Sequence, residues 1–167
     1  MIPLPTAADT HGLGTRLAAI VRAGDLIVLD GPLGAGKTVV VQGLAAGLGA
    51  RGPVTSPTFV IARVHPDGRI PLVHVDAYRL HGTLEVDDLD LDTDLTEAVV
   101  AVEWGAGLVE GLTEAHLRIE LTRPSGDESG ETRLAQLRPY GGDWAQRLET
   151  AGLAALQRRR PSGAGDP

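Results

Sequence analysis

The stretch GPLGAGKT at residues 31–38 constrains the fold of this chain more than any other part of the sequence. It fits the pattern G-x-x-x-x-G-K-[ST] in full and contains Lys37, the one lysine among 15 basic residues. The aliphatic run LIVLD (26–30) precedes it, and VVVQGLAAGLGA (39–50) continues it with the composition of a helix. A glycine-rich turn between a strand and a helix turns successive backbone N–H groups into one concavity that holds phosphate oxygens. The stretch therefore predicts a P-loop that opens a helix near Lys37.

The positions of this loop have separate chemical roles. Lys37 places a compact charge where it reaches the β- and γ-phosphates, and the Thr38 hydroxyl is suited to a magnesium ion. Pro32 has no N–H, so the later amides must form the cradle, helped by the positive end of the helix dipole. We therefore expect the nucleotide to contact Gly34, Ala35, Gly36, Lys37, Thr38 and Val39.

ATP with Mg²⁺ is the ligand that the sequence favours. A GTPase of the usual kind reads guanine with an Asn-Lys-x-Asp loop. This chain has no asparagine, and its one lysine already belongs to the phosphate loop.

Two carboxylates are placed to complete the site. Asp76 ends the apolar run IPLVHVD, and Glu103 ends AVVAVE. A P-loop enzyme needs a carboxylate at a neighbouring strand end, so we expect one of the two to contact magnesium and the other to orient the attacking water. Thr58, in a proline-containing loop, is a candidate switch hydroxyl, and Trp104 is expected beside the nucleotide. His74 alternates with valines and is expected to be a hydrogen-bonded histidine of the interior.

The order of the elements predicts an α/β fold: a P-loop NTPase-like three-layer sandwich whose mixed sheet has a parallel core and antiparallel C-terminal strands. Apolar residues make up 43% of the chain and aromatic residues only 3%, as suits aliphatic strands buried on both faces. We expect a hairpin within 59–75, an antiparallel pair at 116–121 and 132–138, and one helix from Trp144 to the arginine run. Asp9 or Thr10 is expected to cap a first helix that Gly24 ends. Residues 1–160 would form one ATPase domain and 161–167 a disordered tail.

Composition excludes several classes of function. The net charge of −7 argues against a free-standing nucleic-acid binder, which needs a basic face. With no cysteine there is no thiol nucleophile and no thiolate zinc site. The N-terminus lacks the pattern of a signal peptide, and no apolar run reaches the roughly 18 residues of a membrane helix. We expect a cytoplasmic protein without a membrane partner. The seven acidic residues within 85–97 are expected to be a solvated face.

Taken together, GPLGAGKT, SPTF, HVDAYRL and VEW, in this order and spacing, resemble the TsaE family of bacterial tRNA threonylcarbamoyladenosine biosynthesis proteins. The resemblance runs from about Ile2 to Trp104. It implies binding of ATP and magnesium, a weak ATPase activity, and a role in supporting the complex of two partner subunits, TsaD and TsaB. In that complex TsaD transfers a threonylcarbamoyl group to N6 of adenosine 37 in tRNAs that read codons beginning with A, so tRNA would be met only through the partners.

The same resemblance assigns roles to the matching positions of this chain. Lys37 would hold the phosphates, while Thr38 and Glu103 would hold the magnesium. Asp76 would be an essential carboxylate and Thr58 the switch-loop hydroxyl.

Two other classes of function compete with a partner-dependent ATPase. A small-molecule P-loop kinase shares the strand, loop and helix, but it needs an acceptor pocket and a lid that usually carries several arginines. Here Arg63, Arg69 and Arg79 are scattered. A non-catalytic nucleotide-binding adaptor would not need the two strand-end carboxylates.

Overall fold

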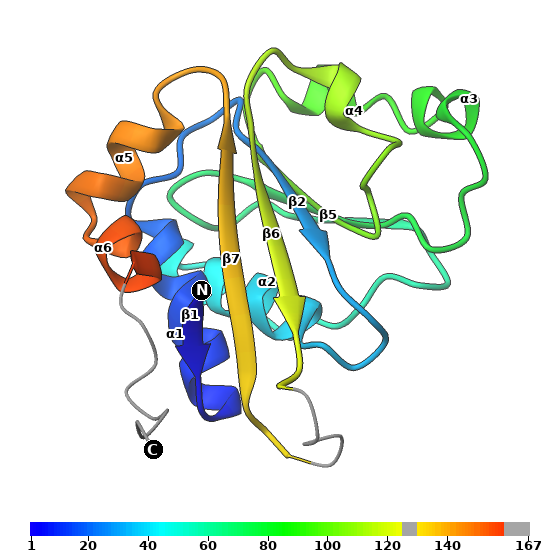
Figure 1. Ribbon diagram of the computed structural model, residues 1–167. Helices are drawn as coiled ribbons and strands as arrows, with labels where there is room; N and C mark the ends of the chain where they lie inside the picture. Colours follow the sequence, from blue (N-terminus) through cyan, green and yellow to red (C-terminus); the bar gives the residue numbers. More distant parts are fainter. Residues whose placement is uncertain (125–129, 159–167) are drawn as a thin grey trace, which may run out of the picture.

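A mixed β-sheet organises the part of the chain that the computed structural model describes, residues 1–124 and 130–158 (Figure 1). Within these residues the sheet has seven strands in the order β1-β7-β6-β2-β5-β4-β3. The strands are β1 (Ile2–Leu4), β2 (Leu26–Asp30), β3 (Ala62–His65), β4 (Leu72–Asp76), β5 (Val99–Glu103), β6 (His116–Thr122) and β7 (Arg133–Tyr140). The tail expected at 161–167 lies outside the described residues, and the single-domain assignment stays a prediction.

Parallel pairing is confined to the centre of the sheet. β2 runs parallel to both β5 and β6, and β5 runs parallel to β4. The edges are antiparallel: β7 pairs with β6, β1 with β7, and β3 with β4. This confirms the predicted parallel core, the hairpin β3–β4 and the C-terminal pair β6–β7. The edge strand β1 was not foreseen, because three residues are too short to show a pattern of alternation.

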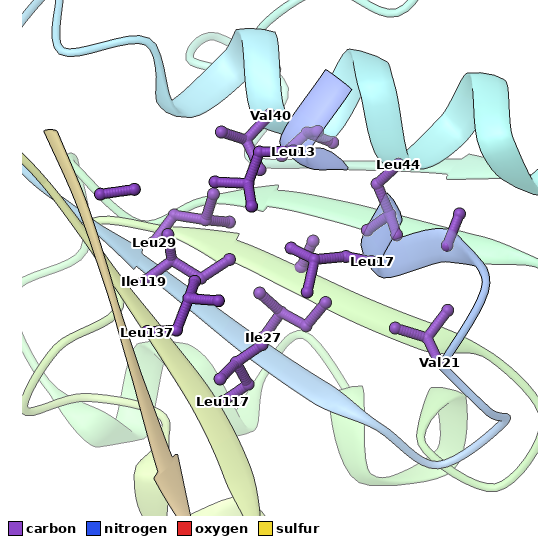
Figure 2. Close-up of a cluster of buried hydrophobic side chains, with 14 of the residues drawn as sticks. Leu13, Leu17, Val21, Ile27, Leu29, Val40, Leu44, Leu117, Ile119 and Leu137 are labelled. Atoms are coloured by element: carbon purple, nitrogen blue, oxygen red, sulfur yellow. The ribbon is translucent and has the colours of Figure 1, made fainter. Parts of the chain in front are cut away.

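Helices cover both faces of the sheet, as the three-layer prediction required (Figure 1). Strand β2 shows why: Ile27 and Leu29 belong to one buried apolar cluster, Leu26 and Val28 to the other. On the first face lie α1 (Ala7–Ala18), α2 (Lys37–Leu48), α5 (Trp144–Thr150) and α6 (Leu153–Arg158). The second face is covered by α3 (Thr83–Asp87), α4 (Leu91–Asp94) and the segment that leads into the 3₁₀ turn Glu110–Leu112. Figure 2 shows the first cluster, in which aliphatic side chains from α1, α2 and the strands interdigitate.

Helices α1 and α2 approach each other closely at two glycines. A Cβ at Gly14 would lie 2.0 Å from the Val40 carbonyl oxygen, and one at Gly43 would lie 1.9 Å from the His11 carbonyl oxygen. Only a hydrogen atom fits at either position. Gly14 of α1 and Gly43 of α2, which lower helix propensity, therefore allow the two helices to pack closely, and α2 is the helix that begins at the phosphate loop.

The boundaries of two expected helices were predicted wrongly. Helix α1 is capped by Thr6, not by Asp9 or Thr10: Asp9 is the third residue of a capping box, in which its carboxylate accepts the Thr6 N–H at 2.9 Å. The helix ends at Ala18, before Gly24. The expected C-terminal helix is split into α5 and α6, because Gly152 adopts a φ of +70° between them.

The acidic stretch 85–97 forms helices α3 and α4, which are anchored by two apolar side chains. Val86 and Leu91 are buried against the sheet, whereas six of the seven carboxylates are exposed and Asp94 is half-buried. The prediction of a solvated face is confirmed.

Across the described residues, the structure has no helix of the length and apolarity needed to cross a membrane.

Candidate active site

The candidate site lies where strands β2, β4 and β5 end. In the parallel register Asp76 of β4 lies beside Glu103 of β5, and Glu103 lies beside Leu29 of β2. Parallel strands bring their carboxyl ends to one edge of a sheet, so the two carboxylates and the glycine loop after β2 converge. Both carboxylates are buried, with 4% and 3% of Asp76 and Glu103 exposed.

The loop between β2 and α2 has a backbone that only glycine adopts readily. Gly31, Gly34 and Gly36 have φ values of +142°, +74° and +99°. Gly36 is the N-cap of α2 and offers no side chain, so no capping side chain occupies the N–H groups at the start of this twelve-residue helix. Those N–H groups point out of the helix end and suit an anion. The predicted helix start at Lys37 is confirmed.

Lys37 is buried, and its ammonium group is directed back onto the loop. Nζ donates hydrogen bonds to the carbonyl oxygens of Gly31 at 2.6 Å and Pro32 at 3.0 Å. It also lies 3.7 Å from the centroid of the Trp104 ring, a cation–π contact. Burial lowers the pKa of Lys37, while the charges of Glu103 and Asp76 oppose that effect.

Glu103 is held by two side chains. The Thr38 hydroxyl donates to its carboxylate at 2.8 Å and 3.1 Å, and Nε2 of His74 lies 2.7 Å from Oε1. The structure thus brings together Thr38 and Glu103, which the resemblance assigned to one ion. His74 is fully buried and hydrogen-bonded, as predicted for an interior histidine.

Asp76 is tied to the proline-containing loop instead. Its Oδ2 accepts hydrogen bonds from the hydroxyls of Ser56 at 3.0 Å and Thr58 at 2.8 Å. Its Oδ1 accepts the backbone N–H of Tyr78 at 2.9 Å. The segment before β3 is therefore held at the site by the carboxylate at the end of β4.

A cleft of about 480 Å³ joins these groups. All ten residues predicted for the site line it: Gly34, Ala35, Gly36, Lys37, Thr38, Val39, Thr58, Asp76, Glu103 and Trp104. Leu33, Ser56 and Tyr78 line it as well. Leu33 and Tyr78 were not predicted. Tyr78 stacks obliquely on Trp104, with ring centroids 5.1 Å apart, and its signal in the sequence was its position two residues after Asp76.

Trp104 adopts an unusual backbone conformation beside the cleft. Its φ is +61°, which is uncommon for a bulky residue, and its N–H donates to the Leu29 carbonyl oxygen at 3.0 Å. This turn directs the chain away from β5 immediately after Glu103 and leaves the indole ring against Lys37.

A strand, glycine loop and helix with carboxylates on the neighbouring parallel strand ends define a P-loop protein of the α/β class. Comparison with known proteins narrows this class. The family model described as threonylcarbamoyl adenosine biosynthesis protein TsaE matches residues 4–133. The chain belongs to the TsaE family, and the resemblance seen in the sequence motifs is confirmed.

Relatives support the assignment over most of the chain. A protein of Streptomyces coelicolor named tRNA threonylcarbamoyladenosine biosynthesis protein TsaE is 58% identical over 137 residues, which cover 80% of this chain and 92% of that protein. A Mycobacterium tuberculosis protein of the same name is 51% identical over 141 residues, covering 79% and 82%. The crystal structure of Bacillus subtilis YdiB superposes with a TM-score of 0.75 at 29% identity, covering 92% of this chain and 93% of YdiB. The fold is therefore that of a solved α/β structure.

Proposed function

We propose that this chain is a magnesium-dependent ATP-binding protein with weak ATPase activity. In this proposal it supports the complex of TsaD and TsaB that transfers a threonylcarbamoyl group to N6 of adenosine 37 in tRNAs reading codons that begin with A. Membership of the TsaE family places the chain in the biosynthesis of this modification. The observation that supports an ATPase is the convergence of the phosphate loop, Lys37, Asp76 and Glu103 on one cleft.

The residues of the cleft have distinct roles in this proposal. The unfilled N–H groups at the start of α2 and the Lys37 ammonium bind the phosphates, and Lys37 leaves the carbonyl oxygens of Gly31 and Pro32 to do so. One carboxylate orients the attacking water by accepting a hydrogen bond from it. Asp76 suits this task, because its hydroxyl partners lie on the loop that lines the same cleft. Positioning and charge stabilisation supply most of the rate in such reactions.

The oxygen donors present fit magnesium. The Thr38 hydroxyl and the Glu103 carboxylate are hard oxygen ligands, and their oxygens lie 2.8 Å apart at the mouth of the phosphate loop. We propose that these two residues hold the ion, directly or through water. When bound, magnesium would neutralise charge on the phosphates.

A kinase of small molecules finds less support in the structure. None of the three arginines considered for a lid lines the cleft. Arg69 donates to the Ala18 carbonyl oxygen at 2.7 Å, Arg63 to the Thr55 hydroxyl at 3.4 Å, and Arg79 to the Thr58 carbonyl oxygen at 3.5 Å. The acidic chain also suits a cytoplasmic protein that meets tRNA only through partner subunits.

The proposal is tested by measuring phosphate release from ATP, with and without the TsaD–TsaB pair. Lys37→Ala serves as the blank, and Lys37→Arg tests whether charge without the ammonium geometry suffices. We expect slow release by the chain alone, strong stimulation by the pair, and loss of both in the two variants. Release that Lys37→Ala retains in full would overturn the ATPase assignment. Formation of ADP only when a small-molecule acceptor is present would show a kinase instead.

A further inference from the structure

His74 lies in the middle of β4 and points to the face of the sheet that carries Asp76 and Glu103. It is fully buried, and its neighbours Val73 and Val75 show that the strand accepts apolar residues here. Burying a histidine costs free energy unless its ring is hydrogen-bonded. Its hydrogen-bond partner is the Glu103 carboxylate, whose Oε1 lies 2.7 Å from Nε2, and both side chains are buried.

The direction of this hydrogen bond follows from the groups around it. An ionised carboxylate can only accept, and Oε1 of Glu103 already accepts the Thr38 hydroxyl at 2.8 Å. The other ring nitrogen of His74, Nδ1, is buried and has no hydrogen-bond partner among the described residues. A ring that carries its proton on Nε2 satisfies the carboxylate and leaves no unpaired N–H on Nδ1. Nε2–H therefore donates to Glu103.

The two carboxylates of the site are thus held by different parts of the fold. Asp76 accepts hydrogen bonds from Ser56 and Thr58 of the loop, whereas Glu103 is hydrogen-bonded by His74, which lies in β4 of the sheet. Because β4 and β5 are paired in register, the backbones of His74 and Glu103 cannot shift relative to each other without breaking the sheet. Glu103 is therefore the carboxylate tied to a side chain of the sheet, and Asp76, on the same paired strands, is the one tied to a loop.

We propose that His74 is a positioning residue that fixes the Glu103 carboxylate toward Thr38 and the magnesium position. The inference rests on the proposed function and adds to it the group that sets the geometry of one ligand. A carboxylate that binds a metal is commonly hydrogen-bonded by a second group of the protein, and loss of such a partner typically lowers metal affinity about 10–100-fold. His74 is placed as such a partner: it bonds Oε1 of Glu103 from within the sheet, while Thr38 reaches both carboxylate oxygens from α2.

Calorimetric titration with adenylyl imidodiphosphate, an ATP analogue that is not hydrolysed, separates this role from simple packing. The quantity compared is the ratio of the dissociation constants measured without and with Mg²⁺. His74→Leu removes the donor, and His74→Gln restores an N–H at similar reach. His65→Leu is the matched control: His65 is buried on the adjacent strand β3, opposite Leu72, and its Nε2 has no partner among the described residues.

We expect His74→Leu to reduce this ratio about 10-fold or more while the Mg²⁺-free dissociation constant changes less than about two-fold. His74→Gln should recover most of the ratio, and His65→Leu should leave it unchanged. A ratio that His74→Leu leaves intact, or that His65→Leu lowers equally, would overturn the inference. The unmodified protein with ¹⁵N-labelled histidine gives a second reading by NMR, which needs no variant to fold: an unprotonated Nε2 at His74 refutes the hydrogen-bond direction. If the unmodified protein shows no Mg²⁺ effect on binding, the proposed function fails, and the inference with it.

Discussion

Replacing Gly14 by alanine should destabilise the protein, although the same change two residues earlier should stabilise it. A Cβ at Gly14 would lie 2.0 Å from the Val40 carbonyl oxygen and 2.6 Å from the Leu44 nitrogen, both backbone atoms that cannot rotate away. Helices α1 and α2 must therefore separate by about 1 Å, and overpacking of this kind costs about 1–3 kcal/mol. Because the clash is with backbone, we expect about 3 kcal/mol, offset by about 1 kcal/mol of improved helix propensity.

Gly12 is the matched control on the same helix. A Cβ there meets nothing within 4 Å, so Gly12→Ala should raise the free energy of unfolding by about 0.5–1 kcal/mol. The two variants should differ by about 3 kcal/mol, which for a chain of this length is about 6–12 °C in Tm. Urea and thermal unfolding of the two variants and the unmodified protein measure the difference. Equal stability of Gly14→Ala and Gly12→Ala would refute the argument that α1 and α2 need this close approach.

Three further predictions concern the ion pair between α5 and Asp25, the pH dependence of stability, and the loop before β3. Arg147 binds Asp25 through two hydrogen bonds of 2.6 Å and 2.9 Å, so Arg147→Met would leave a buried carboxylate without its partner and should lower the free energy of unfolding by about 3–5 kcal/mol in denaturant titrations. Adding Asp25→Asn should restore part of this loss, and no recovery would contradict the ion-pair account. Burial lowers the pKa of His116 from its ordinary 6.5, so the unfolded chain binds more protons and the free energy of unfolding should fall as the pH drops through 6.5. His116→Phe keeps the stacking on Tyr140 and should make the free energy of unfolding less dependent on pH in this range, and an unchanged pH dependence would contradict the role of His116. Thr58→Val removes the hydroxyl that donates to Asp76 and should lower kcat for ATP hydrolysis about 10-fold with little change in nucleotide affinity. An equal loss of kcat and affinity would make Thr58 a binding residue instead.

Much of the site was predictable because its residues follow local rules. The strand before the phosphate loop and the helix start at Lys37 agree with the sequence pattern, since the motif itself specifies a strand, a turn and a helix. Asp76 and Glu103 each end an apolar run, and parallel pairing brings such ends to one edge. That His74 faces the interior followed from alternation along its strand.

The parts that were not predictable depend on contacts between distant segments. Strand order is set by crossovers, so nothing in the sequence near β2 showed that β5 and β6 would flank it. The partner of His74 and the hydroxyls on Asp76 lie 18 to 29 residues away in sequence. Gly14 and Gly43 lower the helix propensity of α1 and α2, but propensity describes an isolated helix and not the neighbour packed against it.

The sole lysine also makes the site chemically addressable. Lys37 carries the only side-chain amine of the sequence, and only 4% of it is exposed. Apart from the α-amine of Met1, a reagent that acylates amines therefore has one target in this sequence, and that target lines the cleft. The extent of acylation at Lys37, read by mass spectrometry of the peptide that contains it, would report on how much of the cleft is occupied. Acylation of this one side chain would thus measure occupancy of the cleft without any change to the sequence.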